Sequence, residues 1–292
     1  MAEPLHATRR DPSRPTAAGR AVALAEMFGI SLLPWQRACL DVALEVDEAG
    51  LPAHRDVIVS TPRQAGKSVL LFVVLMDRLL AGEDQTLLFA AQTRMAARSR
   101  LIDGWWPRLA RSPLAEDFRL KKGAGFEALH HVNGSVLRLL SSEESSGHGE
   151  SVDIAVLDEC WALEAFVEDT VRPATIARPG SQIWCVSTAG TPRSEWFRSK
   201  VESGRAAAAA DATDPVFVEY AAPVDADPGD PAVRRASHPA IGHTVDEATI
   251  AADYATLPPA KFARSYLNQW GADLGDAGWN VIGQDVWKAA LL

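Results

Sequence analysis

The chain has 292 residues, of which 47% are hydrophobic and 23% are charged, and its formal net charge is −9. This length allows one large α/β domain with a small appendage, and the acidic balance argues against a protein that coats nucleic acid with its whole surface. No apolar run approaches the length of a membrane span, and the N-terminus lacks the apolar segment of a secretory signal, so we expect no membrane contact. Cys39, Cys160 and Cys185 lie far apart in apolar stretches, which predicts buried thiols in a reducing cytosol rather than disulfides or a zinc site.

Residues 1–17 contain three arginines and three prolines but little apolar sequence, which predicts a disordered tail. Apolar residues at helical spacing then predict a helix over residues 18–28. A second helix is expected to begin at Pro34, because proline commonly occupies the first position of a helix. Two helices therefore precede the first predicted strand.

A glycine-lysine-serine triplet lies between a short apolar strand at residues 56–60 and an apolar helix at residues 67–80. The connecting loop reads Thr61-Pro62-Arg63-Gln64-Ala65-Gly66-Lys67-Ser68. Strand, tight loop and helix are the context in which this triplet binds phosphate, because the loop N–H groups and the helix N-terminus face the anion. In that role Lys67 would bridge the outer phosphates and the Ser68 hydroxyl would bind Mg²⁺. Thr61 stands where the usual first glycine would be, so a chance triplet at the start of an ordinary helix is the alternative.

Gln36 lies in the helix that Pro34 opens, upstream of this loop. Its amide offers one carbonyl and one NH₂ group, so it could pair with both the donor and the acceptor edge of adenine. An ordinary surface position on the helix is an equally good interpretation of this residue. The sequence alone leaves both open.

A segment rich in arginine and lysine follows a second buried strand at residues 86–91. Between residues 94 and 122 there are eight basic and three acidic residues, a local charge of +5 in a chain of net charge −9. Such an excess predicts a track for phosphate backbones, and a solvated helix face is the alternative of equal weight. The candidate DNA contacts are Arg94, Arg98, Arg100, Lys121 and Lys122.

A second element typical of phosphate chemistry is the apolar strand at residues 152–157, which ends in Asp158 and Glu159. In a parallel sheet, the end of such a strand reaches the same edge as the phosphate loop. Asp158 would hold Mg²⁺ directly or through water, while Glu159 would orient and deprotonate the attacking water. Together the loop and the acidic strand predict ATP and Mg²⁺ as cofactors of an ATPase.

Ser187 and Thr188 end the next apolar strand, at residues 182–186. Their hydroxyl groups could sense the γ-phosphate or the attacking water and relay its loss to neighbouring elements. A plain turn rich in serine and threonine is the alternative interpretation.

The alternation of strands with helices predicts an α/β fold with a mainly parallel sheet flanked by helices on both faces. With the phosphate loop and the acidic strand, this arrangement resembles the P-loop NTPase fold of the ASCE, RecA-like type. Asn133-Gly134 between two apolar runs predicts a hairpin. After Pro223 an acidic linker at residues 225–231 is followed only by predicted helices, at 246–255, 259–270 and 285–292. We therefore expect a tail at residues 1–17, an ATPase domain at 18–223 and a small helical linker subdomain at 224–292.

In combination these motifs resemble the ATPase part of large terminase subunits of tailed bacteriophages, over roughly residues 20 to 290. The loop from Thr61 to Ser68, with its Arg-Gln pair, resembles their phosphate loop. Three further motifs resemble their adenine motif, acidic strand and coupling motif in turn: Leu33-Pro34-Trp35-Gln36, Val156-Leu157-Asp158-Glu159 and Ser187-Thr188-Ala189. Residues 262–270, Trp279 and Trp287 are similar to the segment that follows the motor.

This resemblance implies an ATP-driven motor that threads double-stranded DNA into a procapsid in the host cytoplasm. Its implied partners are the portal protein, a small terminase subunit and further copies of the same chain in a ring. The resemblance also implies that Arg63 contacts the γ-phosphate in its own subunit. Some relatives place an arginine that acts on the neighbouring subunit in the loop before the acidic strand. Here that loop carries His148, a poor replacement, so we expect Arg63 to act in cis.

Terminases usually carry a second, ribonuclease-H-like domain, and this chain stops near where that domain would begin. We therefore expect no nuclease activity in it. Two other functions compete with the motor. A superfamily-2-like helicase fragment would need a second RecA-like domain, which about 70 residues after Pro223 cannot supply. A non-hydrolysing nucleotide-binding module would retain Lys67 but would have no use for Glu159.

Overall fold

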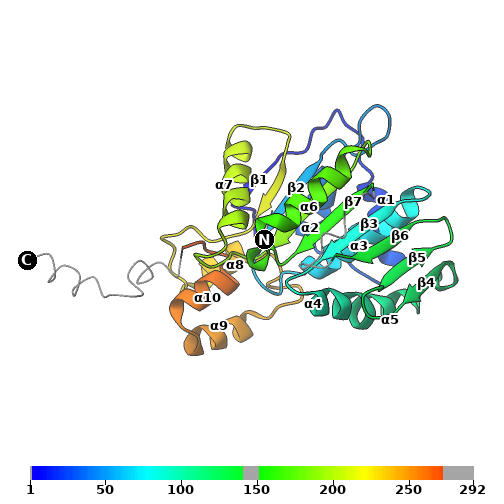
Figure 1. The fold of residues 1–292 in the computed structure, drawn as a ribbon. Coiled ribbons are helices and arrows are strands. Elements are labelled where there is room, and N and C mark those ends of the chain that lie inside the picture. The colour runs from blue at the N-terminus through cyan, green and yellow to red at the C-terminus, as the bar shows by residue number, and fades with distance from the viewer. Residues whose placement is uncertain (1, 141–150, 272–292) are drawn as a thin grey trace, which may run out of the picture.

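The computed structural model describes residues 2–140 and 151–271 (Figure 1). The strands in this part of the chain are β1 His6–Ala7, β2 Asp56–Ser60, β3 Thr86–Ala90, β4 Phe118–Lys121, β5 Ala128–His131, β6 Val136–Leu139, β7 Ile154–Asp158, β8 Gln182–Ser187 and β9 Val216–Glu219. They form one sheet in the order β1-β9-β2-β8-β7-β3-β6-β5-β4. The six strands from β9 to β6 in this order are parallel, and β1, β5 and β4 are antiparallel to their neighbours. The mainly parallel sheet predicted from the sequence is confirmed.

Helices cover both faces of this sheet. The described helices are α1 Ala18–Met27, α2 Pro34–Ala43, α3 Lys67–Ala81, α4 Arg94–Ser99, α5 Trp106–Leu109, α6 Ala165–Ile176, α7 Glu195–Ala209, α8 Pro231–Ser237, α9 Glu247–Thr256 and α10 Pro259–Tyr266. A π-helical segment, Arg100–Trp105, joins α4 to α5. None of the helices in the described part of the chain is long and apolar enough to cross a membrane.

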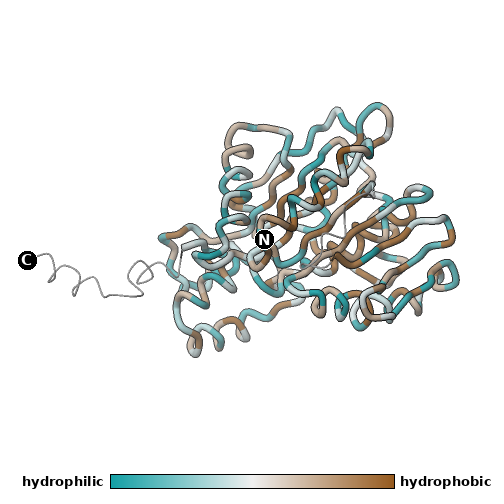
Figure 2. The backbone as a smooth tube through the Cα atoms, viewed as in Figure 1, coloured by the Kyte–Doolittle hydropathy of each residue, from teal (hydrophilic) through white to brown (hydrophobic). Residues whose placement is uncertain are grey.

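The two faces of the sheet form two hydrophobic cores. Alternate residues of β2 point to opposite sides, so Val57 and Val59 pack with α1, α2 and α3, whereas Ile58 packs with α6 and α7. Both faces of the parallel strands are buried, and the apolar colour runs continuously along them in Figure 2. Burial of each large apolar side chain, such as Phe72 on α3 or Phe197 on α7, contributes about 1.5–3 kcal/mol to stability. Burial on both faces holds the sheet in place, and with it the polar residues at the carboxyl ends of the parallel strands.

The prediction of a disordered tail is wrong for residues 2–17. Strand β1 pairs with β9, and the Thr8 side chain donates to the Pro215 carbonyl. Arg10 and Arg14 form ion pairs with Glu45, a carboxylate that is almost fully buried at the end of the α2 region. Composition suggested disorder because the segment contains few apolar residues of its own. The groups that hold it in place, β9 and Glu45, are brought to it by the fold.

Several local expectations also change in the structure. The hairpin at Asn133-Gly134 is confirmed between β5 and β6, and β4 extends it as an unpredicted third strand. Helix α10 ends at Tyr266, earlier than expected. Helix α8 lies just beyond the predicted acidic linker and was not predicted. The predicted helix 285–292, Trp279, Trp287 and His148 lie outside the described residues.

Helices α8, α9 and α10 pack around a small apolar cluster of their own, built from Ala222, Ile250, Phe262 and Leu267. This cluster is joined to the sheet by Asn268, which follows α10. The Asn268 amide donates to the Ser60 hydroxyl at the end of β2 and accepts from the backbone N–H of Ala189 after β8. The helical C-terminal part is thus anchored at the sheet edge where the phosphate loop begins.

Candidate nucleotide-binding site

The loop between β2 and α3 has the backbone shape that the glycine-lysine-serine triplet requires. Gly66 adopts a φ of 95°, and a Cβ atom there would lie 2.8 Å from the Gln36 side-chain nitrogen. Gln64 also has a positive φ, 59°. Glycine is therefore needed at position 66 both for its left-handed backbone and for the close approach of α2. The turn delivers Lys67 and Ser68 to the N-terminus of α3.

Lys67 is buried, and its ammonium group is held by three oxygen atoms. It donates to the carbonyl of Thr61 at 3.2 Å, the carbonyl of Pro62 at 2.9 Å and the hydroxyl of Thr188 at 2.7 Å. Burial lowers the pKa of Lys67 to about 8, and the nearby carboxylates of Glu159 and Asp158 oppose this shift. The side chain thus links the phosphate loop to the end of β8.

Ser68 and Asp158 lie within reach of one cation. Arg100 donates to the Ser68 hydroxyl at 2.5 Å and to an Asp158 carboxylate oxygen at 3.3 Å. Burial, followed by the charge of Glu159, raises the pKa of Asp158 to about 6, and Arg100 opposes that shift. A hydroxyl and a carboxylate are the hard oxygen ligands that suit Mg²⁺, and the bridging guanidinium shows that one positive charge can meet both.

The metal hypothesis does not need a larger protein ligand set. Within the described ranges there is no group of three or more His, Cys, Asp and Glu side chains that could hold a metal ion. Mg²⁺ commonly retains water and takes only one or two protein ligands together with substrate phosphates. The pair Ser68 and Asp158 therefore fits Mg²⁺ better than a metal that requires a closed protein cage.

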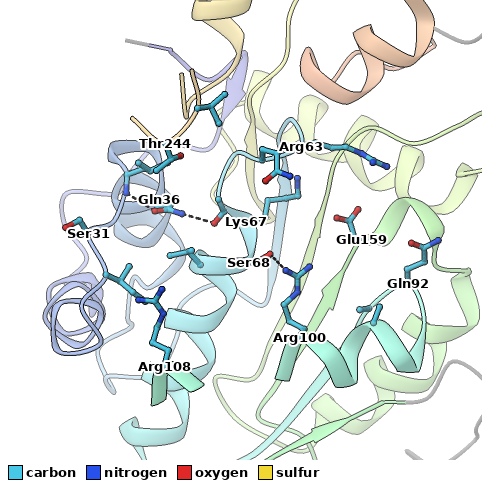
Figure 3. A pocket seen from close by; sticks show the side chains of 18 of the residues that line it. Ser31, Gln36, Arg63, Lys67, Ser68, Gln92, Arg100, Arg108, Glu159 and Thr244 are labelled. Carbon is cyan, nitrogen blue, oxygen red and sulfur yellow. Dashed lines mark hydrogen bonds between the residues drawn. The ribbon is translucent and has the colours of Figure 1, made fainter. Parts of the chain in front are cut away.

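Glu159 adopts a left-handed backbone, with φ 55° and ψ 45°. Such a conformation costs a non-glycine residue roughly 1–3 kcal/mol and is found disproportionately at functional sites. The side chain accepts a hydrogen bond of 2.7 Å from the indole of Trp161, and its backbone N–H donates to Asp158. Glu159 lines the same cleft as Lys67 and is held in a defined orientation, as a general base requires (Figure 3).

Ser187 and Thr188 connect the phosphate loop with the acidic turn. The Ser187 carbonyl accepts from the backbone N–H of Thr61 at 3.0 Å, and the Ser187 hydroxyl accepts from the backbone N–H of Trp161 at 3.0 Å. The Thr188 hydroxyl accepts from Lys67. The pair is therefore bonded to both elements, which is the arrangement that a coupling role requires. That role itself stays a prediction.

Gln36 is only 1% exposed, so the interpretation as a surface residue is wrong. Its carbonyl oxygen accepts from the Leu33 N–H at 2.7 Å, and its NH₂ group donates to the Gly66 carbonyl at 2.8 Å. The neighbouring Trp35 indole donates to the Ala65 carbonyl at 2.9 Å. Both ends of the amide are bonded to backbone, which favours a role in holding α2 against the phosphate loop over the reading of adenine.

The backbone of Arg63 is fixed by the helical C-terminal part, while its side chain is exposed at the cleft. Its N–H donates to the Ser265 carbonyl at 2.8 Å, and its carbonyl accepts from the ring of His238 at 2.9 Å. Burial lowers the pKa of His238 to about 4, so the ring is neutral at pH 7. Sequence analysis missed His238, because a histidine 175 positions away from its partner leaves no local signal.

These residues line a cleft of about 810 Å³, within the usual size range of small-molecule sites. The walls include Arg63, Gln64, Gly66, Lys67, Ser68, Gln36 and Glu159 from the predicted set. They also include residues that were not predicted as nucleotide contacts: Gln92, Arg100, Arg108, Trp161, Thr244 and Val245. Figure 3 shows Lys67, Arg100 and Glu159 directed into this space from different elements.

The structure does not bring the five candidate DNA contacts together. Arg94 and Arg98 both form ion pairs with the buried carboxylate of Glu127, at 2.8 and 3.2 Å. Arg100 points into the cleft that Lys67 and Glu159 also line. Lys121 and Lys122 are exposed, at the end of β4 and just after it. A single continuous track along residues 94–122 is therefore not formed, and the two lysines are its remaining solvent-facing members among the five.

A scan against protein-family models found no match, and neither did a search of curated proteins. Among solved structures, the large terminase of bacteriophage HK97 matches at 22% identity and a TM-score of 0.74, covering 88% of this chain and 56% of that one. The large terminase of a thermophilic bacteriophage matches at 12% identity and a TM-score of 0.60, covering 82% and 54%. The ATPase domain of the Thermus phage P74-26 large terminase matches at 18% identity and a TM-score of 0.59, covering 88% and 98%.

The chain thus spans slightly more than half the length of the HK97 and thermophilic-phage terminases and nearly the whole of the P74-26 domain. The thermophilic-phage protein has been solved with ADP and with ATP-γ-S. At these identities the comparison bears on architecture, and it confirms the fold that the sequence motifs predict. The chain has the fold of the ATPase domain of phage large terminases.

Proposed function

We propose that this chain hydrolyses ATP as the motor subunit of a phage DNA-packaging machine, the ATPase part of a large terminase. The observation that carries this proposal is the cleft lined by Lys67, Ser68 and the oriented carboxylate of Glu159, with the buried Asp158 linked to Ser68 through Arg100. A phosphate anchor, a candidate metal pair and a candidate base are the parts that phosphoryl transfer to water requires. The terminase structures of the same fold support the motor context.

In the proposed reaction, the N–H groups at the start of α3 and the Lys67 ammonium bind the outer phosphates of ATP. Ser68 and Asp158 would hold Mg²⁺, which when bound would neutralise charge on the phosphates. Thr188 and two loop carbonyl groups hold the Lys67 ammonium beside the cleft, and a bound phosphate would replace one or more of these three acceptors. Pro62 and Ala65 act through their backbone carbonyl groups, which accept from Lys67 and from the Trp35 indole respectively.

Glu159 is the proposed general base, and it takes a proton from the attacking water. The Trp161 indole restrains its carboxylate through a hydrogen bond to one of the two oxygens. Asp158, by contrast, is almost fully buried and is directed to Ser68 through Arg100. The two adjacent carboxylates therefore have different surroundings, which supports separate roles for them.

Arg63 is the proposed contact to the γ-phosphate within the same subunit. Its side chain reaches the cleft from a backbone fixed on both sides by Ser265 and His238. The likeness to large terminases supports a homo-oligomeric ring on the portal protein in the host cytoplasm, with double-stranded DNA as the translocated substrate and a small terminase subunit as partner. Ser187 and Thr188, which are bonded to both the loop and the acidic turn, would couple hydrolysis to movement.

The decisive experiment compares Glu159→Gln and Asp158→Asn with the wild-type chain. Phosphate release from ATP and calorimetric binding of ATP with Mg²⁺ are measured in parallel. We expect Glu159→Gln to bind ATP and Mg²⁺ normally and to lose turnover by roughly a thousandfold, because general-base catalysis contributes about 10²–10⁴-fold. Asp158→Asn should lose the contribution of Mg²⁺ to binding.

Identical behaviour of the two variants in binding and turnover would contradict this division of roles. Binding of ATP by the wild-type chain without measurable hydrolysis would favour the non-hydrolysing nucleotide-binding module instead. Turnover should also be measured with and without duplex DNA, since stimulation by DNA is expected of a translocating motor.

A further inference from the structure

Arg100 joins the two residues on which the proposed metal site depends. It lies at the start of the π-helical segment Arg100–Trp105, which follows α4, and its side chain crosses to the phosphate loop and to the end of β7. One guanidinium nitrogen donates to Ser68 at 2.5 Å and the other to Asp158 at 3.3 Å. Figure 3 shows this bridge between Arg100 and Ser68 inside the cleft.

A Mg²⁺ ion bound by Ser68 and Asp158 needs the same oxygen lone pairs. A guanidinium and a divalent cation at one site would repel each other and would compete for these acceptors. Asp158 is about 1% exposed and its carboxylate is stabilised by Arg100 against the effect of burial. Metal binding by this pair therefore requires Arg100 to release it.

The released guanidinium has a defined region in which to move. Arg100 lines the cleft together with Lys67, Gln92 and Glu159, and its side chain is about one-third exposed. The positive charge of Lys67 and the negative charge of Glu159 both face this region. A phosphate bound beside Lys67 would be a strong anionic acceptor close to Arg100. π-Helical segments are rare and occur frequently at functional sites, in keeping with a side chain that serves the cleft.

We propose that Arg100 competes with Mg²⁺ for Ser68 and Asp158 and that, once displaced, it contacts the γ-phosphate of a bound nucleoside triphosphate. This inference rests on the proposed function, because it assumes a nucleotide in the cleft. It makes metal binding and recognition of the γ-phosphate two consequences of one side-chain movement. It also removes Arg100 from the candidate DNA contacts.

The test is a Mg²⁺ titration of the protein bound to a fluorescent ADP analogue, compared between the wild-type chain and Arg100→Ala. Removal of the competing guanidinium should lower the Mg²⁺ concentration at the midpoint by about tenfold, since a charge-assisted hydrogen-bonded pair no longer has to break. The matched control is Arg20→Ala, which deprives another buried aspartate, Asp77, of its arginine on α1, away from the cleft. Its midpoint should not change.

A second measurement tests the contact to the terminal phosphate. At saturating Mg²⁺ the ratio of ATP-γ-S affinity to ADP affinity should fall by about tenfold in Arg100→Ala and stay constant in Arg20→Ala. Arg100→Lys keeps the charge but loses the planar fork that reaches two acceptors, so its values should lie between those of the wild-type chain and Arg100→Ala. These opposite shifts, tighter metal and weaker preference for the triphosphate, are the signature of the exchange.

Unchanged Mg²⁺ midpoints in Arg100→Ala, with the ADP analogue still bound, would overturn the inference and leave the proposed function intact. Failure of the wild-type chain to bind the analogue at all would instead reject the proposed function. If thermal melting shows that Arg100→Ala does not fold, Arg100→Lys carries the same test. A midpoint in Arg100→Lys equal to the wild-type value would then overturn the inference.

Discussion

The nucleotide cleft and the basic segment of residues 94–122 both concentrate charge, but they hold it in different ways. In the cleft, Lys67 and Asp158 are buried, and each is bonded to a group from a distant part of the chain, Thr188 and Arg100 respectively. Burial shifts the pKa of both groups, to about 8 and about 6. These two charges are therefore held in fixed positions, and salt screens their interactions only weakly.

In the basic segment the charges are either neutralised locally or left in water. Arg94 and Arg98 share the carboxylate of Glu127, while Lys121 and Lys122 are exposed. Exposed charges of this kind act over roughly 8–10 Å at physiological ionic strength and contribute little individually. Substitutions in the cleft should thus have large effects that depend on chemistry, and substitutions in the basic segment small effects that depend on salt.

The largest effect expected from this contrast is that of Lys67→Ala on nucleotide binding. The variant removes the buried ammonium that we propose to bind the outer phosphates, and we expect ATP affinity to fall by roughly a hundredfold or more in a calorimetric titration. Lys200→Ala is the control, because Lys200 is paired with Glu168 on the α6 and α7 face, outside the cleft. Unchanged ATP affinity in Lys67→Ala would count decisively against a phosphate loop.

The same contrast explains how far the sequence could be interpreted. The turn from β2 to α3 at Gly66-Lys67-Ser68 and the end of β7 at Asp158 were predictable because each is a continuous motif whose neighbours indicate a strand or a helix. The mainly parallel sheet followed from the same alternation. Charge counts were less informative, since they placed Arg100 with Arg94 as a DNA contact although its side chain is directed to the cleft.

The remaining site residues depend on contacts between segments far apart in the sequence. His238 reaches the carbonyl of Arg63 from the C-terminal helices, and Asn268 reaches Ser60. Neither residue lies in a recognisable motif, so only the packing of α8 to α10 against the sheet edge reveals it. The ordered N-terminus likewise depends on the distant carboxylate of Glu45. Tertiary context, rather than local propensity, decides these positions.

A second prediction uses the pKa of Lys67 to sharpen the description of the cleft. In the folded protein without nucleotide the pKa of Lys67 is about 8, and a bound phosphate should favour the charged form of this side chain. ATP affinity should therefore fall about tenfold per pH unit above 8. Calorimetry at pH 8 in two buffers of different ionisation enthalpy should show uptake of about half a proton per nucleotide. Lys67→Arg, which stays charged, should show neither effect.

The free energy of unfolding has the opposite pH dependence to ATP affinity. The pKa of Lys67 in the folded protein lies below the ordinary value of 10.5, so the unfolded chain binds more protons between pH 8 and 10.5. This residue should therefore increase the free energy of unfolding as the pH rises through that window.

ATP affinity that is independent of pH between 7 and 9.5 would contradict a buried, phosphate-facing lysine.

A smaller effect is expected for Gln36→Ala, and it separates two interpretations of that residue. If the amide reads adenine, ATP should be weakened relative to GTP. Because both ends of the amide are bonded to the backbone of Leu33 and Gly66, we expect instead a similar loss of about five- to tenfold for both nucleotides, in line with the loss of one or two buried hydrogen bonds. The control is Gln85→Ala, which removes an exposed hydrogen bond from the Gln85 side chain to the Glu83 carbonyl. A loss confined to ATP would restore the adenine-reading interpretation.

The smallest effects should come from the basic segment, measured by fluorescence anisotropy with a labelled duplex across a range of salt concentrations. Reversal of the exposed pair, Lys121→Glu with Lys122→Glu, should weaken DNA binding several-fold at low salt and flatten the salt slope by up to about 2, because each lost phosphate contact removes about one unit.

Arg94→Glu with Arg98→Glu should leave that slope nearly constant. It should lower the melting temperature instead, because Glu127, which is buried, would lose its partners and face like charges. A slope that responds to Arg94 and Arg98 but not to the lysines would mean that DNA breaks the Glu127 ion pairs to reach α4, and the contrast between the two regions would then fail.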